Sequence, residues 1–385
     1  MEKWNEYKLG DVLTIKYGKD HKQIADGDVP IYGSGGIMRY GERSLYDGPS
    51  ILIPRKGSLN NILFADKPFW TVDTMFWTII HEDIANPLFV YYSICKKDFA
   101  SLNVGSAVPS LTVPVIEDID ILLPSRGTQD KVVAVLKSLD DKIEVNRQIN
   151  DNLEQQAQAL FKSWFVDFEP FKDQPFVESE LGMIPQGWRV QEAQQIFNIN
   201  IGKTPPRKES EWFSESNEDN VWVSIADMGS CGAFISDSSE YLTDEAVRRF
   251  NVQMVEKDSI LLSFKLTVGR VAIADTRLTT NEAIARFILP KKFYREFLYL
   301  YLKQYKYGNL GSTSSIATAV NSKTIKGMRL LIPNVELIES FSKNTRPLFE
   351  QIRTIQQESR RLAELRDTLL PRLMSGELKV NDVDA

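Results

Sequence analysis

One sequence pattern occurs twice along the 385-residue chain, and this repeat constrains the fold more than any other feature. Trp4 is followed fourteen residues later by Gly18-Lys19, and Trp188 is followed at the same distance by Gly202-Lys203, so the copies are shifted by 184 residues. Matches that recur in the same order indicate a duplicated structural unit.

The match continues with a longer shift in the second part of each copy. The segment ILIPRKGSLNNILFAD aligns without a gap with ILLSFKLTVGRVAIAD, at a shift of 209 residues. This alignment places Lys56 on Lys265 and Ser58 on Thr267. The second copy therefore carries an insertion of 25 residues between its Gly-Lys pair and this segment.

Each copy then continues into a stretch with helical periodicity. Apolar residues recur at alternating spacings of four and three through four heptads, which is typical of a coiled-coil seam. We expect the two helices to pair with each other, in antiparallel orientation. The predicted seam comprises Val132, Leu136, Leu139, Ile143, Leu153 and Leu160 in the first helix and Phe341, Leu348, Ile352, Ile355, Leu362 and Leu369 in the second.

Two asparagines, Asn146 and Asn150, interrupt the apolar seam of the first helix. Polar residues at seam positions lower stability but can define the register and the choice of partner helix. Alternatively, the seam opens to solvent at this point. The sequence is compatible with both interpretations.

The predicted fold class is α+β, with two repeated globular domains separated by the two long helices of an antiparallel coiled coil. Short β-rich runs such as ILIP and RVAIA, separated by Gly-rich turns, support this assignment. We expect domain 1 over residues 1–125, the first helix over 126–167, an exposed linker over 168–185, domain 2 over 186–335, the second helix over 336–376 and a tail over 377–385.

The composition argues against catalysis by a metal ion or by a Ser-His-Asp triad. The chain has 2 His and 2 Cys, too few for a His-rich metal centre, a Cys-based zinc site or a disulfide framework. No phosphate-binding motif is recognisable, and no apolar run approaches the ~18 residues that cross a bilayer. We therefore expect a non-catalytic, cytoplasmic binding protein that holds no metal and contacts no membrane.

Three further segments have a structural interpretation. Asn86-Pro87 comes near the loop with which amino-methyltransferases hold a flipped base, but a helix N-cap followed by Pro at the first helical position explains it better. The segment YGSGG, residues 32–36, indicates a turn whose glycines allow the close approach of a ligand backbone. The aromatic run PFWTVDTMFW, residues 68–77, suits a buried strand better than base stacking.

The net charge of −6 argues at first against nucleic acid as a partner. Residues 1–125 carry −4, however, whereas residues 186–335 carry +3. Arg and Lys contact phosphates or guanine, and Asn contacts adenine. The repeated Gly-Lys and Lys-x-Ser/Thr motifs favour DNA contact over a solvated surface charge, which remains the simpler interpretation elsewhere. The candidate DNA-binding residues are Lys19, Ser34, Arg39, Tyr40, Arg55, Lys56, Ser58, Asn60, Lys203, Thr204, Arg207, Lys208, Lys265, Thr267 and Arg270.

Five motifs mark the boundaries of the two copies. They are LGDV shortly after Trp4, GSAVPSLTVPVIEDIDILLP before the first helix, QALFKSWFVDFEPF at its end, SELGMIPQGW at the start of the second copy and LLPRLMSGEL near the end of the chain. With these motifs and the repeated layout, nearly the whole chain resembles the specificity subunit of a type I restriction-modification system.

This resemblance implies that each domain is a target-recognition domain that reads one half of a bipartite sequence in double-stranded DNA. The helices would set the spacing of the halves and dock two modification subunits, and restriction subunits would join to translocate and cut DNA. S-adenosylmethionine would bind to the partner methyltransferase subunits, so this chain would need no cofactor. The charge of −4 on domain 1 implies that the partner subunits supply part of the contacts that hold the DNA.

Other interpretations share some of these features. A stand-alone modification complex or a fused-nuclease system would use the same kind of subunit. A coiled-coil adaptor with protein-binding ends belongs to a different class. A methyltransferase acting alone would require S-adenosylmethionine binding by the isolated chain.

Overall fold

The computed structural model describes residues 4–310 and 320–380. The chain divides into two compact units. Unit 1 combines residues 1–143 with residues 361–385, and unit 2 spans residues 144–360. Each unit holds one globular domain and one segment of each long helix.

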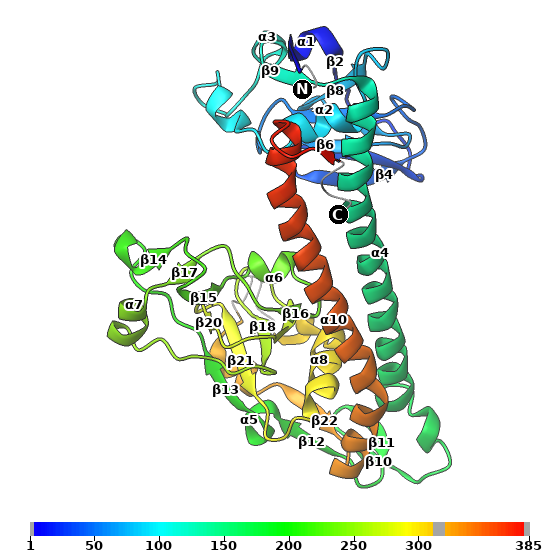
Figure 1. Ribbon diagram of the computed structural model, residues 1–385. Coiled ribbons are helices and arrows are strands. Elements are labelled where there is room, and N and C mark those ends of the chain that lie inside the picture. The colour runs from blue at the N-terminus through cyan, green and yellow to red at the C-terminus, as the bar shows by residue number, and fades with distance from the viewer. Residues whose placement is uncertain (1–3, 311–319, 381–385) are drawn as a thin grey trace. The chain divides into compact units, whose positions relative to one another are not determined.

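In unit 1, a four-stranded sheet has the order β2-β8-β5-β6, a three-stranded sheet has the order β4-β3-β7, and β1 pairs with β9 (Figure 1). The strands are β1 (Asn5–Lys8), β2 (Leu13–Tyr17), β3 (Val29–Gly33), β4 (Gly36–Gly41), β5 (Ser50–Pro54), β6 (Leu63–Ala65), β7 (Trp70–Thr71), β8 (Met75–Ile80) and β9 (Asp120–Leu123). The short helices are α1 (Leu9–Val12), α2 (Pro87–Ile94), α3 (Val113–Glu117) and the 3-10 turn η1 (Phe99–Leu102).

Strand β5 forms the centre of this domain, and all five of its residues are buried. Ile51 and Ile53 pack in a cluster with Phe89 of α2, whereas Leu52 packs in a second cluster with Phe69. Successive side chains of a strand point to opposite faces, so β5 separates two apolar layers. The aromatic run, residues 68–77, contributes buried rings to these layers, as the sequence predicts.

Helix α2 begins as expected from its sequence. The Asn86 side chain accepts hydrogen bonds from the backbone N–H groups of Leu88 and Phe89, and Pro87 is the first helical residue. The structural interpretation of Asn86-Pro87 is therefore confirmed.

Unit 2 repeats this plan with additions. A sheet has the order β13-β21-β18-β19-β16, a second has the order β14-β17-β15-β20, and β12 pairs with β22. The strands are β10 (Phe176–Ser179), β11 (Gly182–Pro185), β12 (Arg189–Glu192), β13 (Asn198–Ile201), β14 (Phe213–Ser214), β15 (Asn220–Val223), β16 (Phe234–Ile235), β17 (Tyr241–Leu242), β18 (Ile260–Ser263), β19 (Val271–Ala274), β20 (Thr279–Thr280), β21 (Ile284–Ile288) and β22 (Arg329–Ile332). The helices are α5 (Ala193–Ile196), α6 (Asp227–Ser230), α7 (Asp244–Arg249), α8 (Tyr294–Gln304) and α9 (Ser322–Lys326), with 3-10 turns η2 (Glu169–Phe171), η3 (Ser210–Trp212) and η4 (Tyr307–Leu310).

The pairing order confirms the repeat strand by strand. The order β2-β8-β5-β6 corresponds to β13-β21-β18-β19, and β4-β3-β7 corresponds to β17-β15-β20. Both copies also share a parallel pair, β3 with β7 and β15 with β20. The strands β14 and β16 and the helices α6 and α7 belong to the longer second copy and have no counterpart among the described elements of unit 1.

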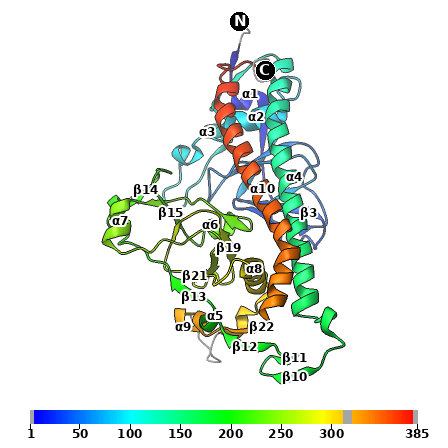
Figure 2. The same ribbon diagram turned by 60° about the horizontal axis from the view of Figure 1, so that its bottom comes forward.

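Residues 168–185 form more than a plain connection. They contain η2 and the hairpin of β10 with β11, which Figure 2 brings forward. Phe171 and Ile184 are buried, and the ring centroid of Phe171 lies 5.4 Å from that of Trp188. The segment is thus anchored to the domain that it precedes.

The long helices are α4 (Arg126–Phe165) and α10 (Val335–Met374), of 40 residues each. Within unit 2, Asn146 of α4 donates hydrogen bonds to Glu358 at 2.7 Å and to Ser359 at 3.2 Å. Within unit 1, Arg366 of α10 donates to Asp140 of α4 at 2.7 Å. Higher numbers on α10 meet lower numbers on α4, so the helices run antiparallel, as predicted.

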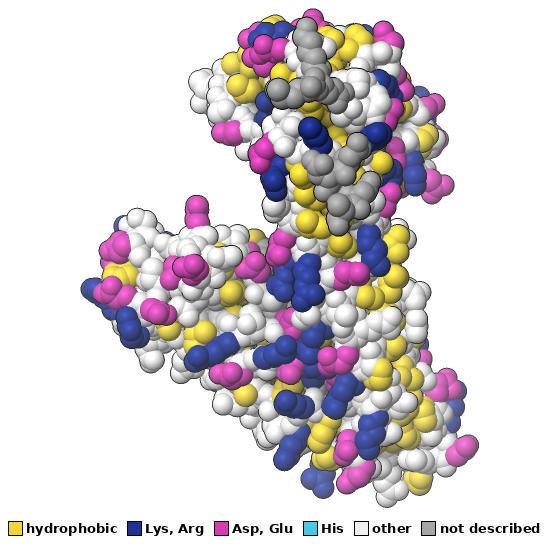
Figure 3. Space-filling model, viewed as in Figure 1, with side chains coloured by type: hydrophobic (Ala, Val, Ile, Leu, Met, Phe, Trp, Pro, Cys, Tyr) yellow, Lys and Arg dark blue, Asp and Glu magenta, His cyan; other side chains and the backbone are white. Residues whose placement is uncertain are grey.

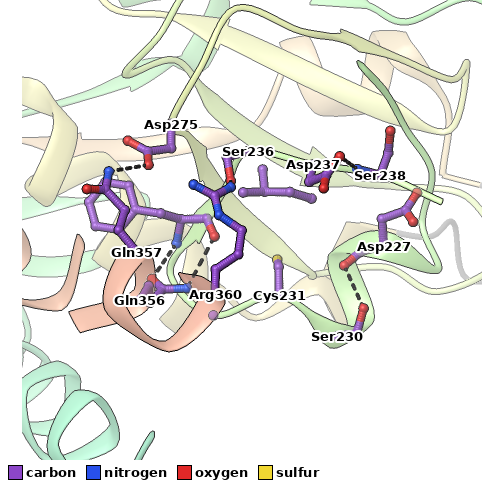
Figure 4. A pocket seen from close by; sticks show the side chains of 13 residues that line it. Asp227, Ser230, Cys231, Ser236, Asp237, Ser238, Asp275, Gln356, Gln357 and Arg360 are labelled. Carbon is purple, nitrogen blue, oxygen red and sulfur yellow. Dashed lines mark hydrogen bonds between the residues drawn. The ribbon is translucent and has the colours of Figure 1, made fainter. Parts of the chain in front are cut away.

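In unit 2, α10 is joined to the edge strand β16. The Gln356 amide donates to the Phe234 carbonyl and accepts from the Phe234 N–H, at 3.3 and 3.1 Å (Figure 4). The Gln357 amide donates to Asp275 Oδ2 at 2.9 Å. Because these bonds occupy the polar edge of β16, the side chains of α10 cover an edge that would otherwise face solvent.

A buried ion cluster reinforces the same contact. Arg353 of α10 lies 2.5 Å from Asp258 and 2.9 Å from Asp275, and it is mostly buried. Arg295 of α8 reaches the same Asp258 at 2.7 Å and Glu350 of α10 at 2.7 Å. The cluster thus ties the sheet and α8 to one face of α10. None of the described helices is long and apolar enough to cross a membrane.

Candidate nucleic-acid interface

The repeated Gly-Lys pair ends a strand in each copy and lies against a loop. In unit 1, the N–H groups of Gly18 and Lys19 donate to the carbonyls of Met75 and Thr71, each at 2.9 Å. In unit 2, the N–H groups of Gly202 and Lys203 donate to the carbonyls of Ile284, at 3.1 Å, and Thr280, at 2.9 Å. We call residues 71–75 and 280–284 the central loops. They match each other at the shift of 209 residues.

The close approach of these backbones explains the glycine of the motif. A Cβ atom at position 18 would lie 2.0 Å from the Val72 carbonyl oxygen, and one at position 202 would lie 1.9 Å from the Asn281 carbonyl oxygen. Neither position accommodates a side chain without movement of the central loop. The glycine therefore has a structural role, while the lysine next to it is exposed in both copies.

The second repeated motif lies on the other side of the same loop. In unit 1, the N–H groups of Arg55 and Lys56 donate to the Thr74 carbonyl at 2.8 and 3.2 Å. In unit 2, the N–H of Phe264, next to Lys265, donates to the Ala283 carbonyl at 2.9 Å. The fold thus brings the Gly-Lys and Lys-x-Ser/Thr motifs of each copy to opposite sides of one central loop.

Each central loop also carries an acidic residue that the sequence interpretation missed, Asp73 in the first copy and Glu282 in the second. Burial raises the pKa of Glu282, but a hydrogen bond from the Thr204 hydroxyl and the charges of Lys265 and Arg207 outweigh this effect and lower the pKa below its ordinary value. The repeat could have revealed this pair of acidic residues, because Asp73 and Glu282 match at the same shift of 209 residues.

In unit 1, the other candidates divide into exposed and internally bonded side chains. Tyr40, Lys56 and Ser58 are exposed. Arg39 is held by Asp26 at 2.9 Å and by two backbone carbonyls. Asn60 binds Asp98 and the N–H of Ala100, so it supports η1.

Two further candidates of unit 1 lie beside the Lys-x-Ser motif. The Ser34 carbonyl, in the turn of YGSGG, accepts from the Asn61 amide at 2.8 Å. The guanidinium of Arg55 lies over the ring of Tyr17, 5.8 Å from its centroid, and Tyr17 is 56% exposed. The prediction of a turn at YGSGG is confirmed by the pairing of Gly33 with Gly36.

In unit 2, Lys203, Lys208, Lys265 and Thr267 are exposed. Arg207 makes two hydrogen bonds to Glu240, at 2.8 and 2.9 Å, and stacks 4.5 Å from the ring of Trp222. The other two candidates, Thr204 and Arg270, have internal partners: Thr204 bonds to Glu282, and Arg270 donates to the Ile225 carbonyl at 2.5 Å.

Basic side chains gather along α10 and the adjoining surface on the face of unit 2 that Figure 3 shows. Some lysines of unit 2 are ion-paired, including Lys257 with Asp275 and Lys343 with Glu339, each at 3.3 Å. The positive charge of unit 2 is therefore partly compensated by its own carboxylates. Among the described residues, no group of three or more His, Cys, Asp or Glu side chains is arranged to hold a metal ion.

The predicted seam positions lie on the inward sides of the helices. All twelve are buried or half-buried. Apolar side chains outside the predicted seam differ: Val145 is 47% and Leu365 is 46% exposed, whereas Phe161 and Phe349 are buried. Asn146 is 1% exposed and bonds to the other helix, so the interpretation that the seam opens to solvent is wrong for this residue.

Comparisons with known proteins agree with this architecture. A model of the type I restriction modification DNA specificity domain matches residues 1–155 and 185–358. The specificity subunit of the type I restriction enzyme HindI from Haemophilus influenzae is 26% identical, with 98% of this chain and 100% of the relative covered. The specificity subunit of the type I restriction enzyme MjaIX from Methanocaldococcus jannaschii is 27% identical, with 99% and 94% covered.

A solved structure shares the fold. The S subunit of a type I restriction-modification system from M. genitalium superposes with a TM-score of 0.55, at 14% identity, with 97% of this chain and 96% of that chain covered. The predicted α+β fold of two repeated domains and two long helices is confirmed by these matches and by the strand order. The chain therefore belongs to the type I restriction modification DNA specificity family.

Proposed function

We propose that this chain is the DNA sequence-specificity subunit of a type I restriction-modification complex, in which each globular domain reads one half of a bipartite target. The observation that carries this proposal is the convergence, in both copies, of two lysine-bearing motifs on one central loop. Backbone hydrogen bonds hold the loops, so the exposed side chains of Lys19, Lys56, Lys203 and Lys265 are available to phosphates or base edges.

The long helices set the distance between the two half-sites and dock two modification subunits. Their apolar seam and the Asn146 contacts support a defined register of the pair. The modification subunits bind S-adenosylmethionine and methylate DNA, and restriction subunits add translocation and cleavage. This chain catalyses no step itself and works in the cytoplasm.

The modest charge of the domains supports a complex in which this chain and its partner subunits both contact the DNA. Domain 1 carries −4 over residues 1–125, and some basic side chains of domain 2 are ion-paired, such as Lys257 with Asp275 and Arg207 with Glu240. Nonspecific binding depends on cations that face phosphates. The chain alone therefore binds DNA weakly, and its partners contribute the remaining positive charge.

The test is selection of DNA from a random duplex library by the chain assembled with a methyltransferase partner. Enrichment of a bipartite sequence is expected. Lys56→Ala and Lys265→Ala should each weaken binding of that sequence and reduce the salt dependence by about one counterion if the lysine contacts a phosphate. Lys343→Ala is the matched control, because this lysine lies on α10, is exposed and pairs only locally with Glu339. If no bipartite sequence is enriched, the chain is an adaptor for other proteins and the proposal fails.

A further inference from the structure

The turn between β18 and β19 carries an unusual residue, Leu266. Its side chain is 99% exposed, and its backbone has a φ of 58°, in the left-handed region. An exposed leucine alone is ordinary. A leucine in this backbone region is not, because residues other than Gly, Asn and Asp are strained there by about 1 kcal/mol or more.

The first copy shows the residue that this backbone favours. At the shift of 209 residues, Leu266 corresponds to Gly57, which has a φ of 92°. A Cβ at Gly57 would lie 2.9 Å from the Ser34 hydroxyl oxygen, so the turn of the first copy is covered by the YGSGG turn. The second copy keeps the left-handed turn but places a large apolar side chain on it, facing solvent.

The turn that presents Leu266 is held firmly. The buried hydroxyl of Ser263 donates to the Thr267 carbonyl at 2.7 Å and accepts from the Arg270 N–H at 3.0 Å. The N–H of Gly269 donates to the Ser263 carbonyl at 3.0 Å. The backbone of the turn that carries Leu266 is therefore held by hydrogen bonds, while the Leu266 side chain projects into solvent.

The flanking residues indicate the ligand. Lys265 and Thr267, on either side of Leu266, are exposed, and Lys265 belongs to the motif that borders the central loop. The strands β18 and β19 that this turn joins are inner strands of the five-stranded sheet, so the turn lies at one end of that sheet. A side chain that reaches DNA from such a turn can read base edges in the major groove. The apolar group that this groove displays is the C5-methyl of thymine.

We propose that Leu266 is a specificity-determining residue that packs on a thymine methyl group in the half-site read by domain 2. This inference rests on the proposed function and names one chemical contact within it. The contact with the thymine methyl group explains why a strained leucine occupies this turn, since a glycine would relieve the strain but could not make the contact. Domain 1, with Gly57 at this position, makes no such contact.

The experiment compares thymine with deoxyuridine, which lacks only the methyl group. The chain, assembled with its methyltransferase partner, is first used to select its target, and each thymine of the half-site read by domain 2 is then replaced in turn. Replacement at one position should weaken binding by wild type roughly fourfold, the factor that corresponds to one buried methyl group. Leu266→Gly should bind the thymine target more weakly by at least this factor and should show no further loss with deoxyuridine.

Two controls separate this contact from a structural role. Leu266→Gly restores the residue of the first copy, so its thermal unfolding temperature should not fall. Val268→Thr alters an exposed side chain of the same turn and should keep the full deoxyuridine effect. The inference is refuted if the complex selects a bipartite target but no thymine responds, or if Leu266→Gly retains the deoxyuridine effect. If no bipartite target is selected at all, the proposed function fails first.

Discussion

Replacing Arg353 with methionine should weaken the attachment of α10 to the domain of unit 2. The guanidinium, whose side chain is 12% exposed, contacts Asp258 at 2.5 Å and Asp275 at 2.9 Å. Removal of one partner from a buried ion pair costs about 3–5 kcal/mol, because the remaining charge is left uncompensated. Arg295 still pairs with Asp258 in the variant, and Lys257 still pairs with Asp275. We therefore expect the lower end of this range, about 3 kcal/mol.

Differential scanning calorimetry measures this loss. For a folding unit of about 200 residues, each kcal/mol lowers the Tm by roughly 2–4 °C, so Arg353→Met should lower the Tm of unit 2 by about 6–12 °C. The matched control is Lys343→Met, which removes an exposed cation from the same helix and should change the Tm by less than about 2 °C. A decrease below about 2 °C for Arg353→Met would show that the cluster contributes little and would refute the assignment.

Three further outcomes are expected. Gly202→Ala should lower the free energy of unfolding of unit 2 by about 1–3 kcal/mol in urea, because the new Cβ would lie 1.9 Å from the Asn281 carbonyl oxygen. The control Gly35→Ala places its Cβ where no atom lies within 4 Å and should change the stability little, so equal effects of the two changes would contradict the steric argument. Burial raises the pKa of Asp258, but the hydrogen bonds and charges of Arg295 and Arg353 outweigh this effect and leave the pKa below its ordinary value. The ion pairs of Asp258 therefore stabilise the fold above about pH 4, and this stabilisation is lost as the pH falls further. The stability difference between wild type and Arg353→Met should shrink in that acidic range, and a constant difference would exclude Asp258 as the partner of Arg353. Inserting four residues into each long helix lengthens the helix by about 6 Å and should lengthen the spacer between the two DNA half-sites by roughly two base pairs, without altering either half-site. An altered half-site would show that the helices do not set the distance between the half-sites.

The sequence predicts well those features that depend on local periodicity or on the repeat. The two helices follow from their heptads, and the cap at Asn86 follows from the Asn-Pro pair. The repeated motifs also place Lys56 and Lys265 at equivalent positions beside the central loops, because both copies keep them at one shift, and their contact with DNA stays a prediction. In each case the information lies within a short stretch or in the comparison of the copies.

Features that depend on contacts between distant segments could not be predicted. The internal bonds of Arg39 to Ile24 and Asp26 arise only once β4 has folded back on the preceding loop. The strand β16 has two residues and is recognisable only through its pairing with β19. The role of Gly202 is likewise invisible in the sequence, because the carbonyl that it approaches lies about 80 residues away. A pattern gives residue types, whereas these roles depend on three-dimensional neighbours.

Main-chain bonds hold the central loops to their neighbours, and in unit 2 the Thr204 hydroxyl adds a bond to Glu282. Lys19 and Lys203 bond through their N–H groups to the carbonyls of Thr71 and Thr280, so the identity of the lysine side chains does not enter these bonds. Substitution of either lysine by another residue with a backbone N–H therefore leaves these main-chain bonds in place. The same main-chain framework can therefore carry different residues at exposed positions of the two copies, as Gly57 and Leu266 illustrate.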